Sequence, residues 1–136
     1  MIIYQKFIYR TDMQANPEVR YLWGDNELRK GVGGQAKEMR GEPNGIGIRT
    51  KKAPGFDDRD LWHDKDYYRQ KKLLDEDFLK AIDALNQNRI IIVPYEGIGT
   101  GFARLKDNAP KTLRYIEKWI DVLKEYKNGG PVKFED

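Results

Sequence analysis

Residues 89–103, with the sequence RIIIVPYEGIGTGFA, decide the fold class of this chain. The run 89–94 is rich in isoleucine and valine, which is typical of a strand buried on both faces in the middle of an α/β sheet. A glycine-rich stretch follows at 96–103, and residues 109–126 then carry apolar side chains at helical spacing. A strand that passes through a glycine loop into a helix predicts an α/β fold.

The same order of strand, glycine-rich turn and helix occurs earlier in the chain. The mostly apolar residues 19–23 run into Gly24-Asp25-Asn26, and a glycine run at 31–34 precedes a short helix-forming segment. These repeated units predict a mixed, mostly parallel sheet. We expect strands at 2–9, 19–23, 46–50 and 89–94 and helices at 35–39, 75–85 and 109–126, with Asn108 capping the last helix.

The composition excludes several classes of protein. The 136 residues fit one domain, and 25 basic against 22 acidic side chains give a net charge of +3 that neither requires nor excludes nucleic acid. Cysteine and serine are both absent, which excludes disulfides, thiolate metal sites and serine or cysteine nucleophiles. The single histidine, His63, excludes a multi-histidine metal centre, and we expect no metal and no cofactor. Neither a membrane span nor an apolar signal core is visible, so we expect a cytoplasmic protein.

Each glycine loop lies at the carboxyl end of an expected strand, where ligands bind in open α/β sheets. Unpaired backbone N–H groups at such turns favour phosphate, and glycine lets the backbone approach a ligand without an intervening Cβ. Two such loops, about 65 residues apart, would together hold the two phosphates of a diphosphate. Ordinary turns without a ligand are the alternative. Neither loop is a Walker loop or a complete Rossmann fingerprint.

Two charged segments accompany the loops. Residues 26–52 hold seven bases against three acids, which predicts a positive potential that attracts a phosphorylated ligand, with a solvated charged face as the alternative. The bases are Arg29, Lys30, Lys37, Arg40, Arg49, Lys51 and Lys52. Residues 53–72 are aperiodic, with five aspartates crowded between 57 and 66. We expect a loop or flap there whose aromatic residues Trp62, Tyr67 and Tyr68 either stack on a base or anchor the segment to the core.

The sequences GDN at 24–26, GVGGQA at 31–36 and GIGTG at 97–101 resemble the two signatures of macrodomain-like proteins. In that family one strand ends in an asparagine-bearing turn before a glycine run, and a second strand leads into a Gly-x-Gly-x-Gly loop. The resemblance is greatest to short macro-like proteins of phage and bacterial genomes, described as ADP-ribose-1″-phosphate-phosphatase-like. It covers residues 19–50 and 89–120.

The resemblance implies a macrodomain-like three-layer sandwich in one domain, with 53–72 as a flap or insertion, and a pocket for ADP-ribose or a related nucleotide. Asn26 would contact the distal ribose with Asp25 as its acidic neighbour, so these two are the catalytic candidates. As an alternative, both side chains only cap the turn. The family's Asn-Ala-Asn triplet is absent, which affects catalysis more than binding. The implied ligand-binding residues are Gly24, Gly31, Val32, Gly33, Gly34, Gln35, Gly97, Ile98, Gly99, Thr100, Gly101 and Phe102.

The sequence is compatible with three functions. The first is a nucleotide-binding module that, as an enzyme, hydrolyses an ADP-ribosyl or terminal phosphate bond, with Asp25 or Asn26 positioning water. The second is a non-catalytic phage anti-defence sponge that sequesters an ADP-ribose-derived, cyclic immune signal, and such a sponge is expected to be a homo-oligomer. The third, a nucleic-acid-binding protein, is disfavoured by the low net charge and the acids of 57–77.

Overall fold

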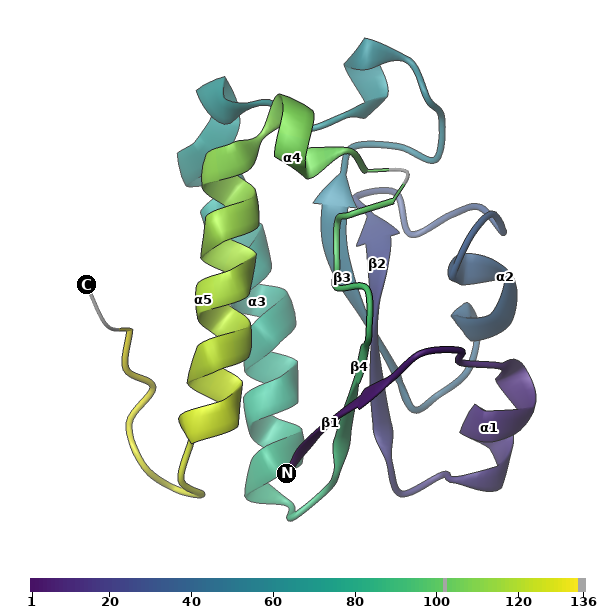
Figure 1. Ribbon diagram of the computed structural model, residues 1–136, viewed down its shortest axis with the longest axis vertical. Helices are drawn as coiled ribbons and strands as arrows, with labels where there is room; N and C mark the ends of the chain where they lie inside the picture. The colour runs from purple at the N-terminus through teal and green to yellow at the C-terminus, as the bar shows by residue number, and fades with distance from the viewer. Residues whose placement is uncertain (102, 135–136) are drawn as a thin grey trace.

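A sheet of four parallel strands runs through the centre of the protein in this computed structural model (Figure 1). The structure describes residues 1–101 and 103–134. All pairings between the four strands are parallel, so the α/β class is confirmed, while the antiparallel member of a mixed sheet is not found among the described strands. In spatial order the strands are β1 (Ile2–Gln5), β4 (Ile91–Pro94), β2 (Arg20–Asn26) and β3 (Gly45–Lys51).

The isoleucine-rich run forms an inner strand, as its composition predicts. All four residues of β4 are buried, and β4 pairs with β1 on one side and with β2 on the other. Its side chains alternate between the faces of the sheet: Ile91 and Val93 join a large core, whereas Ile92 joins a smaller one. In β2, Leu22 and Trp23 divide between the same two cores.

Two long helices cover one face of the sheet and two short helices cover the other (Figure 1). α3 (Tyr67–Asn86) and α5 (Pro110–Glu125) build the large core. α1 (Arg10–Ala15) and α2 (Ala36–Met39) cover the opposite face with Met13 and Met39. No helix in the described part of the chain combines the length and apolar character that a membrane crossing requires.

The end of β1 and the start of α3 differ from the sequence expectation. β1 stops at Gln5 instead of continuing through the apolar alternation of 2–9, and the chain turns into α1. α3 begins at Tyr67, inside the segment 53–72 that we expected to be a loop, and not at Asp75. Its first residues, YYRQKK, are mostly polar and show no apolar periodicity, so tertiary packing determines this boundary.

The start of α5 also differs from expectation. Asn108 is the last residue of a short helix, α4 (Leu105–Asn108), and Ala109 precedes α5 without a side-chain capping bond. Pro110 occupies the first turn, a position where a missing N–H costs no helical hydrogen bond.

The strand order contains a topological switch point. After β2 the chain passes through α2 to β3, whereas after β3 it returns across the other face through α3 to β4, on the far side of β2. The helices that follow the neighbouring strands β2 and β4 therefore lie on opposite faces of the sheet. The register between these strands covers only Arg20–Ile91 and Tyr21–Ile92. A switch point of this kind opens a crevice at the carboxyl ends of the strands.

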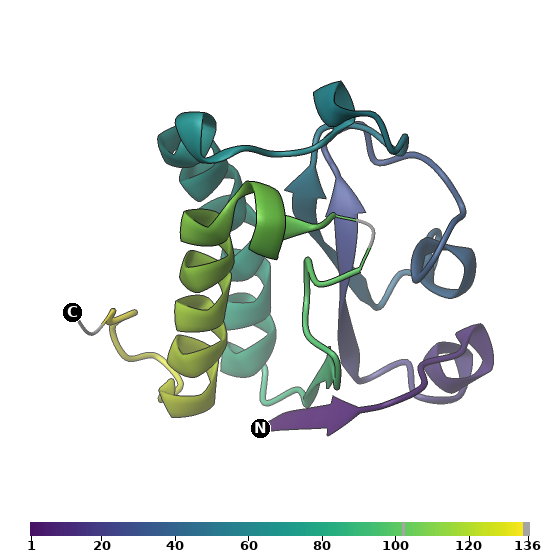
Figure 2. The same cartoon turned by 45° about the horizontal axis from the view of Figure 1, so that its top comes forward.

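Residues 53–66 cross the carboxyl ends of the strands on the way from β3 to α3 (Figure 2). The segment contains two 3₁₀ helices, η1 (Asp58–Asp60) and η2 (Asp64–Asp66). Trp62 is fully buried in the large core, and its Nε1 donates a hydrogen bond to Glu27 at 2.8 Å. Of the two roles expected for Trp62, the buried position fits the anchoring role.

Candidate functional site

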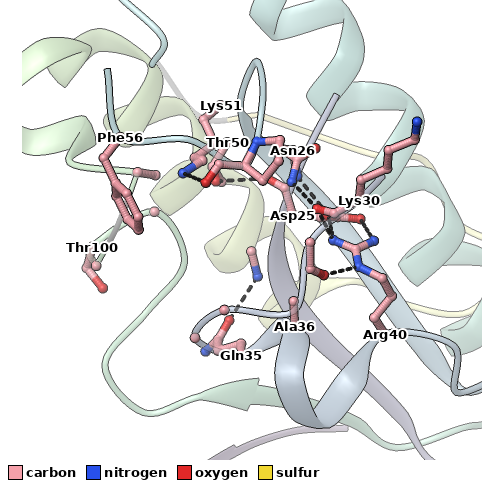
Figure 3. A pocket seen from close by; sticks show the side chains of 18 of the residues that line it. Asp25, Asn26, Lys30, Gln35, Ala36, Arg40, Thr50, Lys51, Phe56 and Thr100 are labelled. Carbon is pink, nitrogen blue, oxygen red and sulfur yellow. Dashed lines mark hydrogen bonds and ion pairs between the residues drawn. The ribbon is translucent and has the colours of Figure 1, made fainter. Parts of the chain in front are cut away.

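A cavity of about 270 Å³ lies at the switch point (Figure 3). Its walls are the ends of β2 and β3, the two glycine-rich loops, and the turn that follows β3. The two loops, 66 residues apart from Gly31 to Gly97, thus meet around one space. The predicted site residues that line it are Gly24, Asp25, Asn26, Gly31, Gly33, Gly34, Gln35, Gly97, Gly99, Thr100 and Gly101.

Three predicted ligand-binding residues are not among the lining residues. Val32 is 72% exposed to solvent and stands outside the cavity. Ile98 is 3% exposed and belongs to the large core, so its side chain supports the second loop from beneath. Phe102 lies outside the described residues.

The first loop, which follows β2 and contains the glycine run 31–34, depends on two glycines in left-handed backbone conformations. Gly31 has φ +98° and Gly34 has φ +56°. A Cβ on Gly31 would lie 2.9 Å from the Cβ of Pro54, so this loop packs directly against the turn after β3. The N–H of Gly24 donates to Gln35 Oε1 at 2.9 Å and ties the end of β2 to the start of α2.

The second loop, which follows β4 and contains the sequence GIGTG at 97–101, is shaped by two further glycines in left-handed conformations. Gly97 has φ +91° and Gly99 has φ +83°. A Cβ on Gly99 would lie 2.4 Å from Leu105 Cδ1, which excludes any side chain at this position without rearrangement. The hydroxyl of Thr100 donates to the carbonyl of Glu96 at 2.9 Å and closes the loop on itself.

Several backbone donors of the two loops are available to a ligand. Within residues 1–101 and 103–134, no acceptor receives a hydrogen bond from the N–H groups of Gly33, Gly34, Gly99 or Thr100. Backbone N–H groups that have no partner in the protein can bind anions.

Asp25 is enclosed by two arginines. Its Oδ1 accepts hydrogen bonds from Arg40 Nη2 at 2.6 Å and from the N–H of Asn26 at 2.8 Å, and its Oδ2 accepts one from Arg29 Nη1 at 3.2 Å. The side chain is only 3% exposed. Both oxygens therefore hold the first loop in place.

Asn26 is engaged in the same way. Its Oδ1 accepts a hydrogen bond from the N–H of Leu28 at 3.0 Å, and its Nδ2 donates to the carbonyl of Lys30 at 2.8 Å. These contacts are typical of an asparagine that fixes a turn. The catalytic role that the resemblance implies for Asp25 and Asn26 stays a prediction, and the contacts fit the alternative in which both side chains order the loop.

A second buried carboxylate extends the ion pairs toward α3. Asp77 is fully buried and accepts hydrogen bonds from Arg29 Nη2 at 2.7 Å and from the N–H of Arg49 at 2.8 Å. Burial alone would lower the pKa of Arg49, but hydrogen bonds to Asp77 and Glu76 outweigh it and hold the pKa above its ordinary value. Since Arg29 also bonds Asp25, the pairs join the first loop to α3 and β3.

Lys51, at the end of β3, is a buried cation in the cavity wall. It is 7% exposed, and its Nζ donates to the carbonyls of Gly55 at 2.8 Å and Pro54 at 3.3 Å. The ammonium also lies 5.0 Å from the centroid of the Phe56 ring. Burial lowers the pKa of Lys51, and the charge of Asp60 offsets part of this effect. In the described part of the chain, Lys51 forms no ion pair with a carboxylate.

Sequence reasoning did not assign nine of the lining residues to the site. Three of them, Lys30, Arg40 and Lys51, belong to the basic group of residues 26–52, to which the sequence analysis assigned only a positive potential. Nothing in the sequence distinguished these three from Arg29 and Arg49, which pair with Asp77. Others come from the turn after β3, and no pattern in the sequence predicted the path of this turn. The nine are Lys30, Ala36, Arg40, Thr50, Lys51, Pro54, Phe56, Glu96 and Ala103.

A family model matches residues 3–119, a range that includes every residue of the cavity wall. The chain belongs to a family of unknown function, DUF7831. No curated protein and no solved structure matches it.

Proposed function

We propose that the cavity binds an ADP-ribose-type nucleotide through the two glycine-rich loops. The observation that carries this proposal is the meeting of both loops around one cavity at the switch point of the sheet. Nucleotides bind at this position in many parallel α/β sheets, with their phosphates on loop N–H groups. The macrodomain-like three-layer sandwich is part of the same proposal and is supported by helices on both faces of the sheet.

The phosphates are assigned to the donors of the loops. The N–H groups of Gly33, Gly34 and Thr100 have no acceptor in the described part of the chain. Two lysines, Lys30 and Lys51, line the same cavity and add positive charge. Arg40 also lines it, but its guanidinium is held by Asp25.

The base is assigned to the rim of the cavity. Phe56 is an aromatic residue that lines the cavity and is 69% exposed, and nucleotide bases stack on aromatic side chains. Of the aromatic residues that we expected to stack, Tyr67 and Tyr68 contact each other, with ring centroids 5.4 Å apart, and neither lines the cavity. Phe56 therefore takes the role that the sequence assigned to its neighbours.

Binding without turnover is the form of the proposal that the contacts favour. The side chains of Asp25 and Asn26 make hydrogen bonds with the backbone of the first loop and with Arg40. These contacts give both side chains a structural role, whereas a side chain that orients water must direct its hydrogen-bonding atoms to the water. Sequestration of the nucleotide is thus our first choice, and hydrolysis of an ADP-ribosyl or terminal phosphate bond is the alternative.

Calorimetric titration with ADP-ribose, its 1″-phosphate and cyclic ADP-ribose isomers tests the proposal, with mass spectrometry of each ligand afterwards. Binding with an unchanged ligand supports sequestration, whereas conversion of a ligand supports hydrolysis. Lys30→Ala should weaken binding about tenfold, the size of one charge-assisted contact. Lys37→Ala is the matched control, because Lys37 belongs to the same basic group but does not line the cavity. The proposal is refuted if none of the ligands binds.

A further inference from the structure

The cavity wall at Gly24 presents hydrogen-bond acceptors and a donor side by side. A Cβ at residue 24 would enter a space bordered by Thr50 Oγ1 at 3.7 Å, Gln35 Oε1 at 3.9 Å and the backbone nitrogen of Gly99 at 3.9 Å. All four residues line the cavity, and Figure 3 shows Thr50 and Gln35 approaching from two sides. The three polar atoms come from β3, the first loop and the second loop, so they meet only in the folded protein.

The hydrogen-bond partner of Thr50 and that of Gln35 determine whether the atom at this space donates or accepts. The Thr50 hydroxyl donates to the carbonyl of Asp25 at 3.1 Å, which can only accept, so Thr50 Oγ1 offers lone pairs to the cavity. Gln35 Oε1 accepts from the N–H of Gly24, which can only donate, so the oxygen of this amide and not its nitrogen borders the space. The N–H of Gly99 has no acceptor in the described part of the chain and is a donor.

We propose that the space at Gly24 is a subsite for a hydroxyl group of a sugar, and that phosphate binds elsewhere in the cavity. A hydroxyl donates to Thr50 Oγ1 or Gln35 Oε1 and accepts from the N–H of Gly99, which satisfies both kinds of partner. A phosphate oxygen without a proton would accept from Gly99 but would face two oxygens that have no proton to share. This inference rests on the proposed function in one respect: the sugar is the ribose of a nucleotide.

Backbone NMR titrations with two probes, ribose 5-phosphate and inorganic phosphate, test the assignment directly. Ribose 5-phosphate should shift the amide resonances of Gly24 and Gly99, whereas phosphate alone should shift those of Gly33 and Gly34 and leave Gly99 in place. If phosphate alone shifts Gly99 as far as the sugar phosphate does, or if neither probe shifts it, the hydroxyl subsite is wrong.

Gly24→Ala gives a second, independent test. Its methyl group would make contacts of 3.7–3.9 Å, ordinary van der Waals distances, so the variant should fold while its subsite is filled. The affinity for ribose 5-phosphate should fall about tenfold or more, and the affinity for phosphate should stay within about twofold. Equal losses for both probes would overturn the assignment.

Thr50→Val removes the acceptor and should weaken ribose 5-phosphate binding about fivefold, with recovery in Thr50→Ser. Thr11→Val, on the exposed part of α1, is the matched control. If ribose 5-phosphate obeys these expectations but ADP-ribose does not bind, the proposed function fails and the subsite stands. If ADP-ribose binds and neither Gly24→Ala nor Thr50→Val weakens it, the function stands and the subsite fails.

Discussion

Replacement of Asp77 by asparagine should destabilise the protein strongly. The carboxylate is fully buried and accepts one hydrogen bond from Arg29 and three from Arg49, at 2.7–3.0 Å. Asparagine keeps the size of the side chain but provides one oxygen, and its NH₂ group then faces donors. Removing one partner of a buried ion pair costs about 3–5 kcal/mol. Because Arg29 and Arg49 keep Asp25 and Glu76 as partners, we expect the low end of this range, about 3 kcal/mol.

Urea denaturation measures this loss. With a slope of about 1.5 kcal/mol per molar urea, a loss of about 3 kcal/mol lowers the midpoint by about 2 M. Asp83→Asn is the matched control, since Asp83 lies on the same helix but is exposed, and its midpoint should stay near that of the wild type. If the midpoint of Asp77→Asn falls within about 0.3 M of this control, the buried ion pairs do not stabilise the fold and the reasoning fails.

Two further predictions concern the second loop and Lys51. Gly99→Ala should lower the melting temperature by several degrees, because its Cβ would lie 2.4 Å from Leu105 Cδ1 at a φ of +83°. Gly101→Ala, with open space around its Cβ, should leave the melting temperature unchanged, and equal melting temperatures of the two variants would refute this account. Because burial lowers the pKa of Lys51, the unfolded chain keeps this proton over a pH range in which the folded protein releases it, so the free energy of unfolding should rise with pH through that range. Denaturation at pH 8 and pH 10.5 should show a larger rise for the wild type than for Lys51→Met, and parallel pH profiles would contradict this expectation.

Sequence patterns predicted the parts of the fold that depend on local periodicity. The apolar run of 89–94 predicted an inner strand, and β4 confirms it with four buried residues. The turns of 53–66 and the start of α3 at Tyr67 could not be predicted, because polar residues without periodicity adopt the structure that their tertiary contacts stabilise. Trp62 illustrates the difference: its aromatic character is visible in the sequence, but its burial depends on the distant helices of the large core.

For the site, the sequence by itself determined the two glycine-rich loops and their place after strands, because glycine spacing and strand composition are local properties of the chain. The tertiary structure alone decided which side chains face the cavity and which are occupied elsewhere. Asp25 and Asn26 are prominent in the sequence, yet their polar atoms bind the first loop, whereas Thr50, Gln35 and Gly99 surround the space at Gly24. The physical reason is that hydrogen bonds and ion pairs between residues far apart in the chain depend on distances that only the packing of the strands and helices sets.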